Sequence, residues 1–288
     1  MPVTPAQSPS RRALALRLAT GAGLLGLATL AYARYVEPQW VEVVHQELTL
    51  PRLAPKFDGY KIVQISDIHL DEYFEQSRLM RFVRLVNEQK PDLIAITGDF
   101  VHYDAQRFAP ILVECLRELA PRDASVAVLG NHDHETDPDV VREALREAGV
   151  IELRNLVHTL RREGAELHIA GVDSVKEDEQ RLDVVLRQLP PSGAVVLVAH
   201  EPDYADRSAV AGRIDLQLSG HSHAGQVRLP IVGPPRLTYL GEKYDIGRYQ
   251  VGNMILYVNR GLGMLPPRVR FLCRPEITAL TLRSPCDP

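Results

Sequence analysis

Short apolar runs recur along this chain of 288 residues, and many of them end in a polar block. Runs of four to eight residues rich in Val, Ile and Leu are typical of buried strands. We predict six early strands, at residues 61–66, 92–97, 125–129, 167–172, 194–199 and 214–219. Apolar residues at helical spacing lie between several of them, at 79–86, 111–119, 140–148 and 182–189. Alternating strands and helices predict an α/β domain.

Five polar blocks directly follow five of these strands. The blocks are Asp67-Ile68-His69, Gly98-Asp99, Gly130-Asn131-His132-Asp133, His200 and Gly220-His221-Ser222-His223. Ligands in open α/β sheets gather at the carboxyl ends of strands, so we expect these side chains to meet at one edge. Glycines 98, 130 and 220 are expected where the strand turns and backbone passes close to a ligand.

The residue types in these blocks indicate a site for two divalent cations. Carboxylate, amide and imidazole groups are hard or borderline metal ligands, and no cysteine lies among them. Two adjacent cations need an anionic ligand between them to offset their repulsion, and we predict that Asp99 is this bridge. Spacing alone does not show which cation each histidine binds. His132 is left over for proton transfer.

The five blocks resemble the pattern of the calcineurin-like metallophosphoesterase family, which reads D-x-H, G-D, G-N-H-D/E, a lone H and G-H-x-H. The resemblance covers roughly residues 60–282 and implies two packed mixed β-sheets flanked by helices. It implies that one metal takes Asp67, His69, Asp99 and His223, and the other Asp99, Asn131, His200 and His221. It further implies that His132, oriented by Asp133, faces the leaving group.

The resemblance and the ligand chemistry together predict a phosphoesterase, with a phosphodiester or pyrophosphate as substrate. A metal-bridging hydroxide attacks phosphorus and His132 serves as general acid. Manganese is our first choice of metal, and the ligands exclude neither iron nor zinc. Arg260, in a basic cluster with Arg268, Arg270 and Arg274, is a candidate for binding substrate phosphate, against the alternative of a solvated face.

Features outside the ligands resemble the exported or membrane-associated phosphodiesterase branch of the family, some of whose members are UDP-2,3-diacylglucosamine pyrophosphatases. The chain departs from many relatives at Gly98-Asp99-Phe100-Val101-His102, where their pattern is G-D-x-x-D. His102 or Asp104 then takes the role of the second aspartate. Two further alternatives are a non-catalytic metal-binding envelope protein and a peptide or amide metallohydrolase, which explains the block containing His132 less well.

The first 37 residues differ in kind from the rest, and we assign residues 38–288 to the catalytic domain. Arg11, Arg12 and Arg17 precede an apolar stretch of 16 residues that ends before Arg34. Ser10-Arg11-Arg12 fits a twin-arginine export signal, and Ala31-Tyr32-Ala33 fits a signal-peptidase site. The segment is therefore a cleaved signal or an uncleaved anchor, and the domain is expected on the extracytoplasmic face rather than the cytoplasmic one.

Charge and cysteine content set the remaining bounds. The net charge of −4 and the pI near 6.2 give no basic field of the kind that nucleic-acid binding needs as a main role. Cys115 lies in a helical pattern and is expected in the core. A Cys273–Cys286 disulfide, the oligomeric state and the natural substrate stay open.

Overall fold

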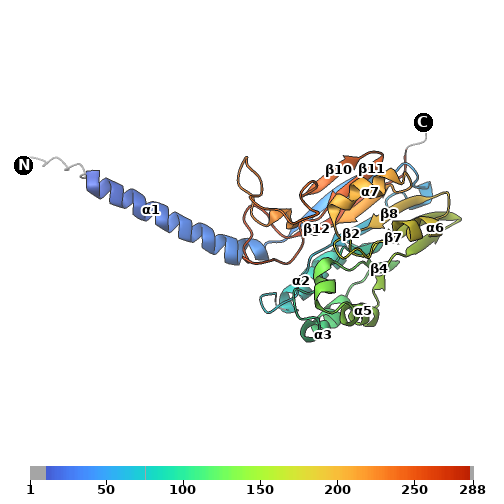
Figure 1. The fold of residues 1–288 in the computed structure, drawn as a ribbon, viewed down its shortest axis with the longest axis horizontal. Coiled ribbons are helices and arrows are strands. Elements are labelled where there is room, and N and C mark those ends of the chain that lie inside the picture. Colours follow the sequence, from blue (N-terminus) through green and yellow to red (C-terminus); the bar gives the residue numbers. More distant parts are fainter. Residues whose placement is uncertain (1–10, 75, 286–288) are drawn as a thin grey trace, which may run out of the picture.

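Two six-stranded sheets pack face to face in the computed structural model, which describes residues 11–74 and 76–285 (Figure 1). Ser10 of the twin-arginine motif and Cys286 lie outside the described residues. The first sheet has the order β1 (Glu42–Thr49), β12 (Glu276–Arg283), β2 (Lys61–Ile65), β3 (Leu93–Ile96), β4 (Ala124–Ala127), β5 (Ile151–Glu152). The second has the order β10 (Gly247–Val251), β11 (Met254–Val258), β9 (Leu216–Ser219), β8 (Ala194–Val198), β7 (Ala165–Gly171), β6 (Val157–Arg162).

Helices cover the outer faces of both sheets. The longer ones on the first sheet are α2 (Gln76–Glu88), α3 (Ala105–Leu116) and α5 (Pro138–Glu147), with the short α4 (Asn131–Thr136) between them. On the second sheet lie α6 (Leu182–Gln188) and α7 (Ala205–Val210). The predicted α/β fold of two mixed sheets flanked by helices is confirmed.

The apolar alternation of the strands explains this layering. Ile62, Leu93 and Val126 of the first sheet pack against Val196 and Leu216 of the second in a core between the sheets. The other face of the first sheet packs on α2, α3 and α5 in a separate cluster that contains the buried Cys115, as predicted. The other face of the second sheet packs on α6 and α7. A strand that is buried on both faces requires a near-continuous apolar run, and such runs are the pattern from which the sequence predicts these strands.

The direction of the strands brings the polar blocks together. β2, β3 and β4 run parallel to one another, and so do β8 and β9. The blocks therefore leave the carboxyl ends of both sheets at the same end of the sandwich.

Two later apolar runs, near residues 254–259 and 277–282, have no helix between them, so the sequence favours their antiparallel pairing as strands. This prediction is wrong. β11 pairs with β9 and β10 in the second sheet, whereas β12 pairs with β1 and β2 in the first. The loop between them, residues 259–275, crosses from one sheet to the other beside the polar blocks. Its backbone is bonded there, since Leu262 N donates to Ser66 O and Gly263 N to Asp67 O.

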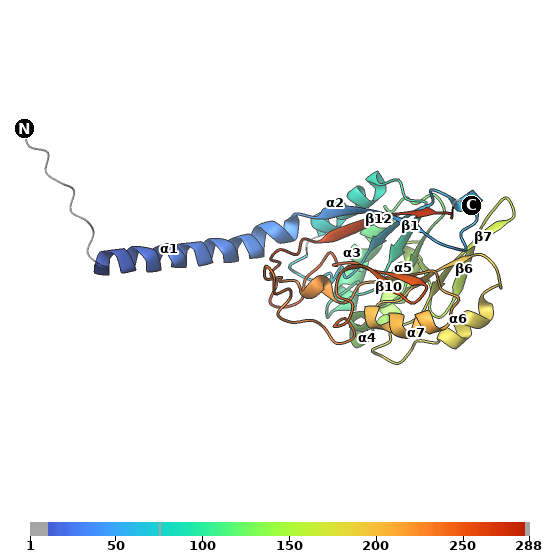
Figure 2. The ribbon, with the colours of Figure 1, turned by 90° about the horizontal axis from the view of Figure 1, so that it is seen from above.

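The chain before β1 forms a long projecting helix, α1 (Arg11–Ala31), which continues through a π-helical turn at Tyr32–Val36 (Figures 1 and 2). The stretch Leu14–Gln39 is long and apolar enough to cross a membrane, and its most apolar part is not buried against the protein; signal sequences share these properties. The end of this helix is attached to the domain. Arg270 N donates to Ala33 O, and the buried Glu37 carboxylate accepts from the backbone N–H groups of Leu272 and Cys273.

Candidate metal centre

Two buried groups of side chains can each hold a cation. Asp67, His69 and His223 form one group, and Asp99, His200 and His221 form the other. In the first group, His223 Nε2 lies 3.0 Å from His69 Nε2 and 3.2 Å from Asp67 Oδ1. In the second, His221 Nδ1 lies 3.1 Å from His200 Nε2.

Asp99 joins the two groups. Its Oδ2 atom lies 3.3 Å from His69 Nε2 and 3.2 Å from His200 Nε2, so one carboxylate faces both sets of imidazoles. Its Oδ1 atom accepts the backbone N–H of His132 at 2.9 Å, which fixes the plane of the carboxylate. This is the arrangement that the sequence predicts for a carboxylate shared by two cations.

In two histidines, one ring nitrogen is bonded to a backbone carbonyl, which leaves the other nitrogen free to bind a metal. His200 Nδ1 donates to Thr97 O at 2.6 Å, and His221 Nε2 donates to Tyr239 O at 2.7 Å. The opposite nitrogen of each ring is therefore directed into the second group. Metal-binding imidazoles commonly make such a bond to a backbone carbonyl, because it fixes both tautomer and ring orientation.

The sequence also predicts Asn131 as a ligand beside the second group. Asn131 begins α4 after β4 and lines the same cavity as Asp99. Its Nδ2 donates to Glu135, whereas its buried Oδ1 has no hydrogen-bond partner among the described residues. A buried amide oxygen without a partner is costly unless a further group binds it, and a divalent cation is such a group. The residues therefore fit the pair of cations that the sequence implies.

Burial sets the ionisation of the first group. It raises the pKa of Asp67 to about 6, and the neighbouring charge of Asp99 adds to the rise. Burial, together with the neighbouring histidines, keeps the pKa values of His69 and His223 well below the usual range. Neutral imidazole is the form that binds a metal, and a cation would in turn favour the charged form of Asp67.

The second group balances burial against strong local charge. Burial would lower the pKa of His200, but Asp99 and Asp67 outweigh it and hold that pKa well above its usual range. Burial would likewise raise the pKa of Asp99, and the positive potential of His200 and His69 depresses it instead. A cation here would replace the proton of His200, because metal binding requires the neutral ring.

Asp133 holds the backbone around the shared carboxylate. Its two oxygens accept N–H groups from Gly130, Asp99, Phe100 and Val101 at 2.8–3.2 Å. The ring of His132 is instead bonded through Nδ1 to the carbonyl of His102, at 3.2 Å. The resemblance implies that Asp133 orients His132. In the structure, however, the Asp133 carboxylate binds the backbone around Asp99, and the His132 ring is bonded to His102 instead.

His102 occupies the position where the chain departs from the family pattern. Its ring lies 5.1 Å from that of His132 and 5.5 Å from that of His69, measured between centroids. Burial and the nearby His132 lower its pKa. Asp104, the other residue considered for this role, caps α3 by accepting the N–H of Arg107.

Two glycines are required by close approach rather than by flexibility. A Cβ atom at Gly130 would collide with the carboxylate of Asp99, and one at Gly220 would collide with Ser66 and Asp67. Both contacts bring the backbone of one block against the carboxylate of another. The predicted reason for glycine at these positions is confirmed.

Arg260 lies apart from the residues that line the cavity. Its guanidinium pairs with Glu276 and, at 2.9 Å, with Glu42, so it ties β1 and β12 to the crossing loop. The rest of the predicted basic cluster is similarly engaged. Arg268 pairs with Asp71, Arg274 pairs with Glu42, and the fully buried Arg270 donates to backbone carbonyls of the crossing loop.

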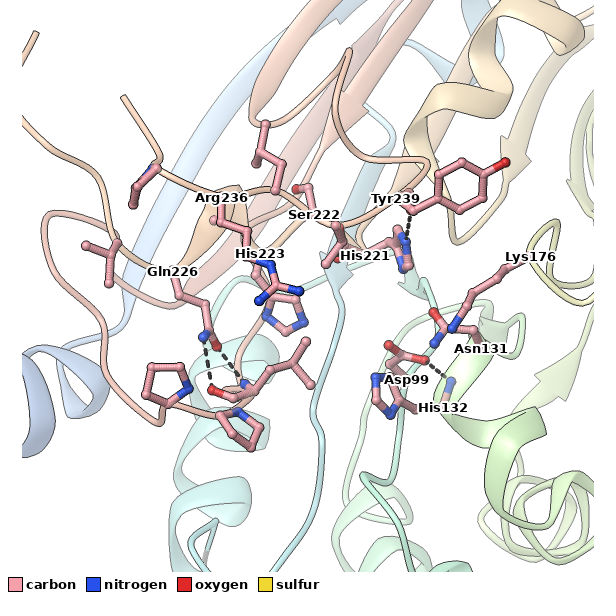
Figure 3. A pocket seen from close by; sticks show the side chains of 18 residues that line it. Asp99, Asn131, His132, Lys176, His221, Ser222, His223, Gln226, Arg236 and Tyr239 are labelled. Atoms are coloured by element: carbon pink, nitrogen blue, oxygen red, sulfur yellow. Dashed lines mark hydrogen bonds between the residues drawn. The ribbon is translucent and has the colours of Figure 1, made fainter. Parts of the chain in front are cut away.

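A cavity of about 490 Å³ opens over the metal groups and presents two other cations, Lys176 and Arg236 (Figure 3). Figure 3 shows Lys176 directed toward Asn131 and Arg236 toward His223. His132 lines the same cavity, and its side chain is one-fifth exposed. Sequence reasoning missed both cations, because each is a single basic residue in an irregular loop with no motif around it.

Comparison with known proteins agrees with the geometry. A family model described as calcineurin-like phosphoesterase matches residues 60–225. The uncharacterized metallophosphoesterase YkuE of Bacillus subtilis is 38% identical over 93% of this chain and 94% of its own. Phosphodiesterase YaeI of Escherichia coli is 29% identical over 92% of this chain and 96% of its own length. A transmembrane protein with a metallophosphoesterase domain from Danio rerio is 33% identical over 84% of this chain and 57% of its own.

Proposed function

The chain belongs to the calcineurin-like phosphoesterase family, and on that premise we propose that it is a binuclear metal-dependent phosphodiesterase. The observation that carries the proposal is the position of Asp99 Oδ2, between His69 of one group and His200 of the other. The name of the Escherichia coli relative, phosphodiesterase YaeI, supports the same reaction class.

Seven side chains would hold the two ions. One ion would take Asp67, His69, Asp99 and His223, and the other would take Asp99, Asn131, His200 and His221. When bound, such ions polarise phosphoryl oxygens and lower the pKa of water, with manganese as our first candidate and iron or zinc as others. Asp133 keeps Asp99 in place through four backbone bonds, so the shared ligand needs no rearrangement when substrate binds.

His132 would supply the proton to the leaving group. The carbonyl of His102 holds a proton on His132 Nδ1 and leaves Nε2 as the atom that carries the transferable proton. Arg236 would neutralise the substrate phosphate from the rim of the cavity, and Lys176, which pairs with Glu135, would contribute a second positive charge there. This role was predicted for Arg260, whose guanidinium is committed to two carboxylates.

The shape of the cavity favours a diester over a monoester. Part of its wall is apolar and is made by Val227, Leu265, Pro266 and Pro267. A phosphate with two organic substituents can place one beside this apolar wall, whereas a monoester leaves the wall exposed to water.

Hydrolysis of a bis-aryl phosphate and of the matching aryl monophosphate tests the proposal. Full-length protein is stripped with a chelator and restored with manganese. We expect the diester to be cleaved faster, and His132→Gln to lower the rate on an alkyl-leaving-group diester by ~10²–10⁴-fold with metal content unchanged. His158→Gln, on β6, is the matched control. Bound metal without cleavage of either ester would support a non-catalytic metal-binding protein.

A narrower version names UDP-2,3-diacylglucosamine as substrate, on the basis of the family resemblance. The apolar wall suits its acyl chains, and its pyrophosphate presents a P–O–P bond to the metal centre. Because this nucleotide sugar is cytoplasmic, this version requires the cavity on the cytoplasmic face. This nucleotide sugar belongs in the same assay. Cleavage of it slower than of the simple diester would remove this version and leave the phosphodiesterase.

We further propose that α1 is a retained anchor with the domain on the extracytoplasmic face. Arg11, Arg12 and Arg17 lie at its amino-terminal part, which favours a cytoplasmic position for that end. The residue before the candidate cleavage point, Ala33, is buried, and its carbonyl accepts from Arg270. The intact mass of the chain purified from membranes tests this. A mass that corresponds to a chain beginning at Arg34 would establish cleavage, after export by either the twin-arginine or the general secretory route.

A further inference from the structure

Exposed apolar residues gather on the loop between β9 and β10. Leu229 and Gly233 pair through two backbone hydrogen bonds, 2.8 and 2.9 Å long, and close a hairpin around residues 230–232. At its tip Ile231 is fully exposed and Val232 is 76% exposed. Leu272, on the loop that crosses between the sheets, is also more than half exposed.

Two of these residues also hold an unfavourable backbone conformation. Ile231 has φ 69° and Leu272 has φ 52°, in the left-handed region where glycine or asparagine is usual. An exposed, β-branched apolar residue in such a position contributes nothing to the core. A local rule broken without a gain in packing is typical of a surface that serves a purpose outside the fold.

Backbone hydrogen bonds connect this tip to the foot of α1. Arg270 N donates to Ala33 O, Phe271 N donates to Gln226 O, and Arg228 N donates to Phe271 O. The hairpin begins at the next residue, Leu229. In both views the loops of residues 220–246 and 259–275 lie at the end of the domain from which α1 leaves (Figures 1 and 2).

The surroundings of the tip match the surface of a bilayer. α1 is apolar and exposed, so it requires a membrane or another apolar partner to cover it. Tyr35 and Trp40 stand exposed just after it, where aromatic residues occur at membrane interfaces. Residues 225–240 contain no acidic residue, and Arg236 supplies a positive charge that suits anionic headgroups, whereas Arg228 pairs with Asp245.

We propose that Ile231, Val232 and Leu272 form a docking surface that enters the same bilayer as α1. The cavity wall adjoins this surface, because Val227 and Leu265 line the cavity and belong to the two loops that carry the surface. Docking would hold the cavity at headgroup level and present it with the phosphodiester of a membrane lipid. The assignment of a lipid substrate rests on the proposed phosphodiesterase function, whereas the docking does not.

Tryptophan fluorescence in reconstituted full-length protein tests the docking. Trp40, the single tryptophan, is first replaced by Phe, and Val232→Trp is compared with Val210→Trp. Val210 is the matched control. It is also a valine, it is 87% exposed at the end of α7, and it lies before the amino-terminal end of β9, whereas Val232 follows the carboxyl-terminal end of that strand. The vesicles contain phosphatidylcholine, with and without dibrominated acyl chains, and about one-fifth phosphatidylglycerol. We expect quenching and a blue shift at position 232 only. No quenching at 232, or equal quenching at both positions, would overturn the proposal.

A second comparison separates the docking from the chemistry. We expect Val232→Asp to lower headgroup release from vesicle phosphatidylglycerol by at least ~10-fold relative to Val210→Asp, with hydrolysis of soluble bis-aryl phosphate unchanged in both. Equal rates of the two variants on vesicles would contradict the role of docking in presenting the lipid, and no headgroup release by the wild-type protein would contradict the lipid substrate. If the wild-type protein cleaves neither ester, the phosphodiesterase function fails, and the fluorescence result still decides the docking.

Discussion

At the scale of single residues, five of the seven candidate ligands hold strained backbone conformations. Asp67, His69, Asp99, His221 and His223 all have positive φ, between 46° and 65°. Such conformations cost of order 1 kcal/mol or more for a residue with a Cβ atom, and they persist only where the surrounding structure imposes them. The strain brings each side chain back over the end of its strand and into the shared site.

This strain can be measured at His221. Both His221→Gly and His221→Ala remove the imidazole, but only glycine adopts a φ of 65° without cost. We expect the metal-free Gly variant to be more stable than the Ala variant by about 1 kcal/mol in denaturant unfolding. An Ala variant of equal or greater stability would show that the backbone relaxes and that the ligand stores no strain.

A second residue-scale prediction concerns pH. His134 Nε2 lies 2.7 Å from Asp173 Oδ1, and this hydrogen bond raises the pKa of His134. Burial would raise the pKa of Asp173, but His134 outweighs it and lowers that pKa. The raised pKa of His134 stabilises the fold fully below its unfolded value of about 6.5, and this contribution is lost as pH rises through the folded pKa. The lowered pKa of Asp173 stabilises the fold above the unfolded pKa of about 3.9, and this contribution is lost as pH falls through the folded pKa.

The free energy of unfolding of wild type and His134→Gln should therefore differ most between those two limits. We expect the advantage of the wild type to shrink as pH rises from slightly acidic to alkaline. The exposed His45, replaced in the same way, controls for the loss of a histidine. A difference that stays constant across this range would mean that the bond to Asp173 does not depend on the charge of His134.

At the scale of elements, the strands that carry the site were predictable and the pairing of the later ones was not. β3 and β8 are buried on both faces, so their sequences are continuous apolar runs within sharp limits, and the run of β2 is interrupted only by Gln64 after its first residue. β5 has two residues and β6 is largely half-exposed, so neither leaves a comparable pattern. Whether β11 and β12 share a sheet depends on where residues 259–275 cross, and local sequence does not encode that.

The same contrast holds for the candidate site. The ligands could be found because each follows a predicted strand and together they form an ordered motif. Lys176 and Arg236 could not, because a cation on an irregular loop acquires its position only from the tertiary fold. The ion pairs of Arg260 were unpredictable for a related reason: its partners Glu42 and Glu276 are distant from it in sequence and adjacent only in the folded sheet.

The end of the α1 helix gives a prediction at this scale. Glu37 is fully buried, and its carboxylate accepts the N–H groups of Leu272 and Cys273. Glu37→Ala leaves these donors unpaired, which we expect to cost about 1–3 kcal/mol of stability. Glu47→Ala, which removes an exposed ion pair with Arg283, should cost less than about 1 kcal/mol. Equal effects in unfolding of the detergent-solubilised chain would show that the foot of α1 is not part of the folded domain.

At the scale of the whole molecule, the two sheets contribute different parts of one centre. The first sheet carries Asp67, Asp99 and Asn131, and the second carries His200, His221 and His223. The site therefore exists only when the sandwich has closed, and Asp99 is the group through which the halves meet. The projecting α1 and the loops beside it then set how this centre faces its surroundings.

The most direct test of this account is metal content together with diester hydrolysis in Asp99→Asn. We predict that the wild-type chain binds two divalent ions and that Asp99→Asn binds fewer and hydrolyses bis-aryl phosphate at least ~100-fold more slowly. Asp139→Asn, which changes an exposed carboxylate on α5, should match the wild type in both measurements. An Asp99→Asn protein that retains two ions and full activity would contradict the shared-carboxylate centre.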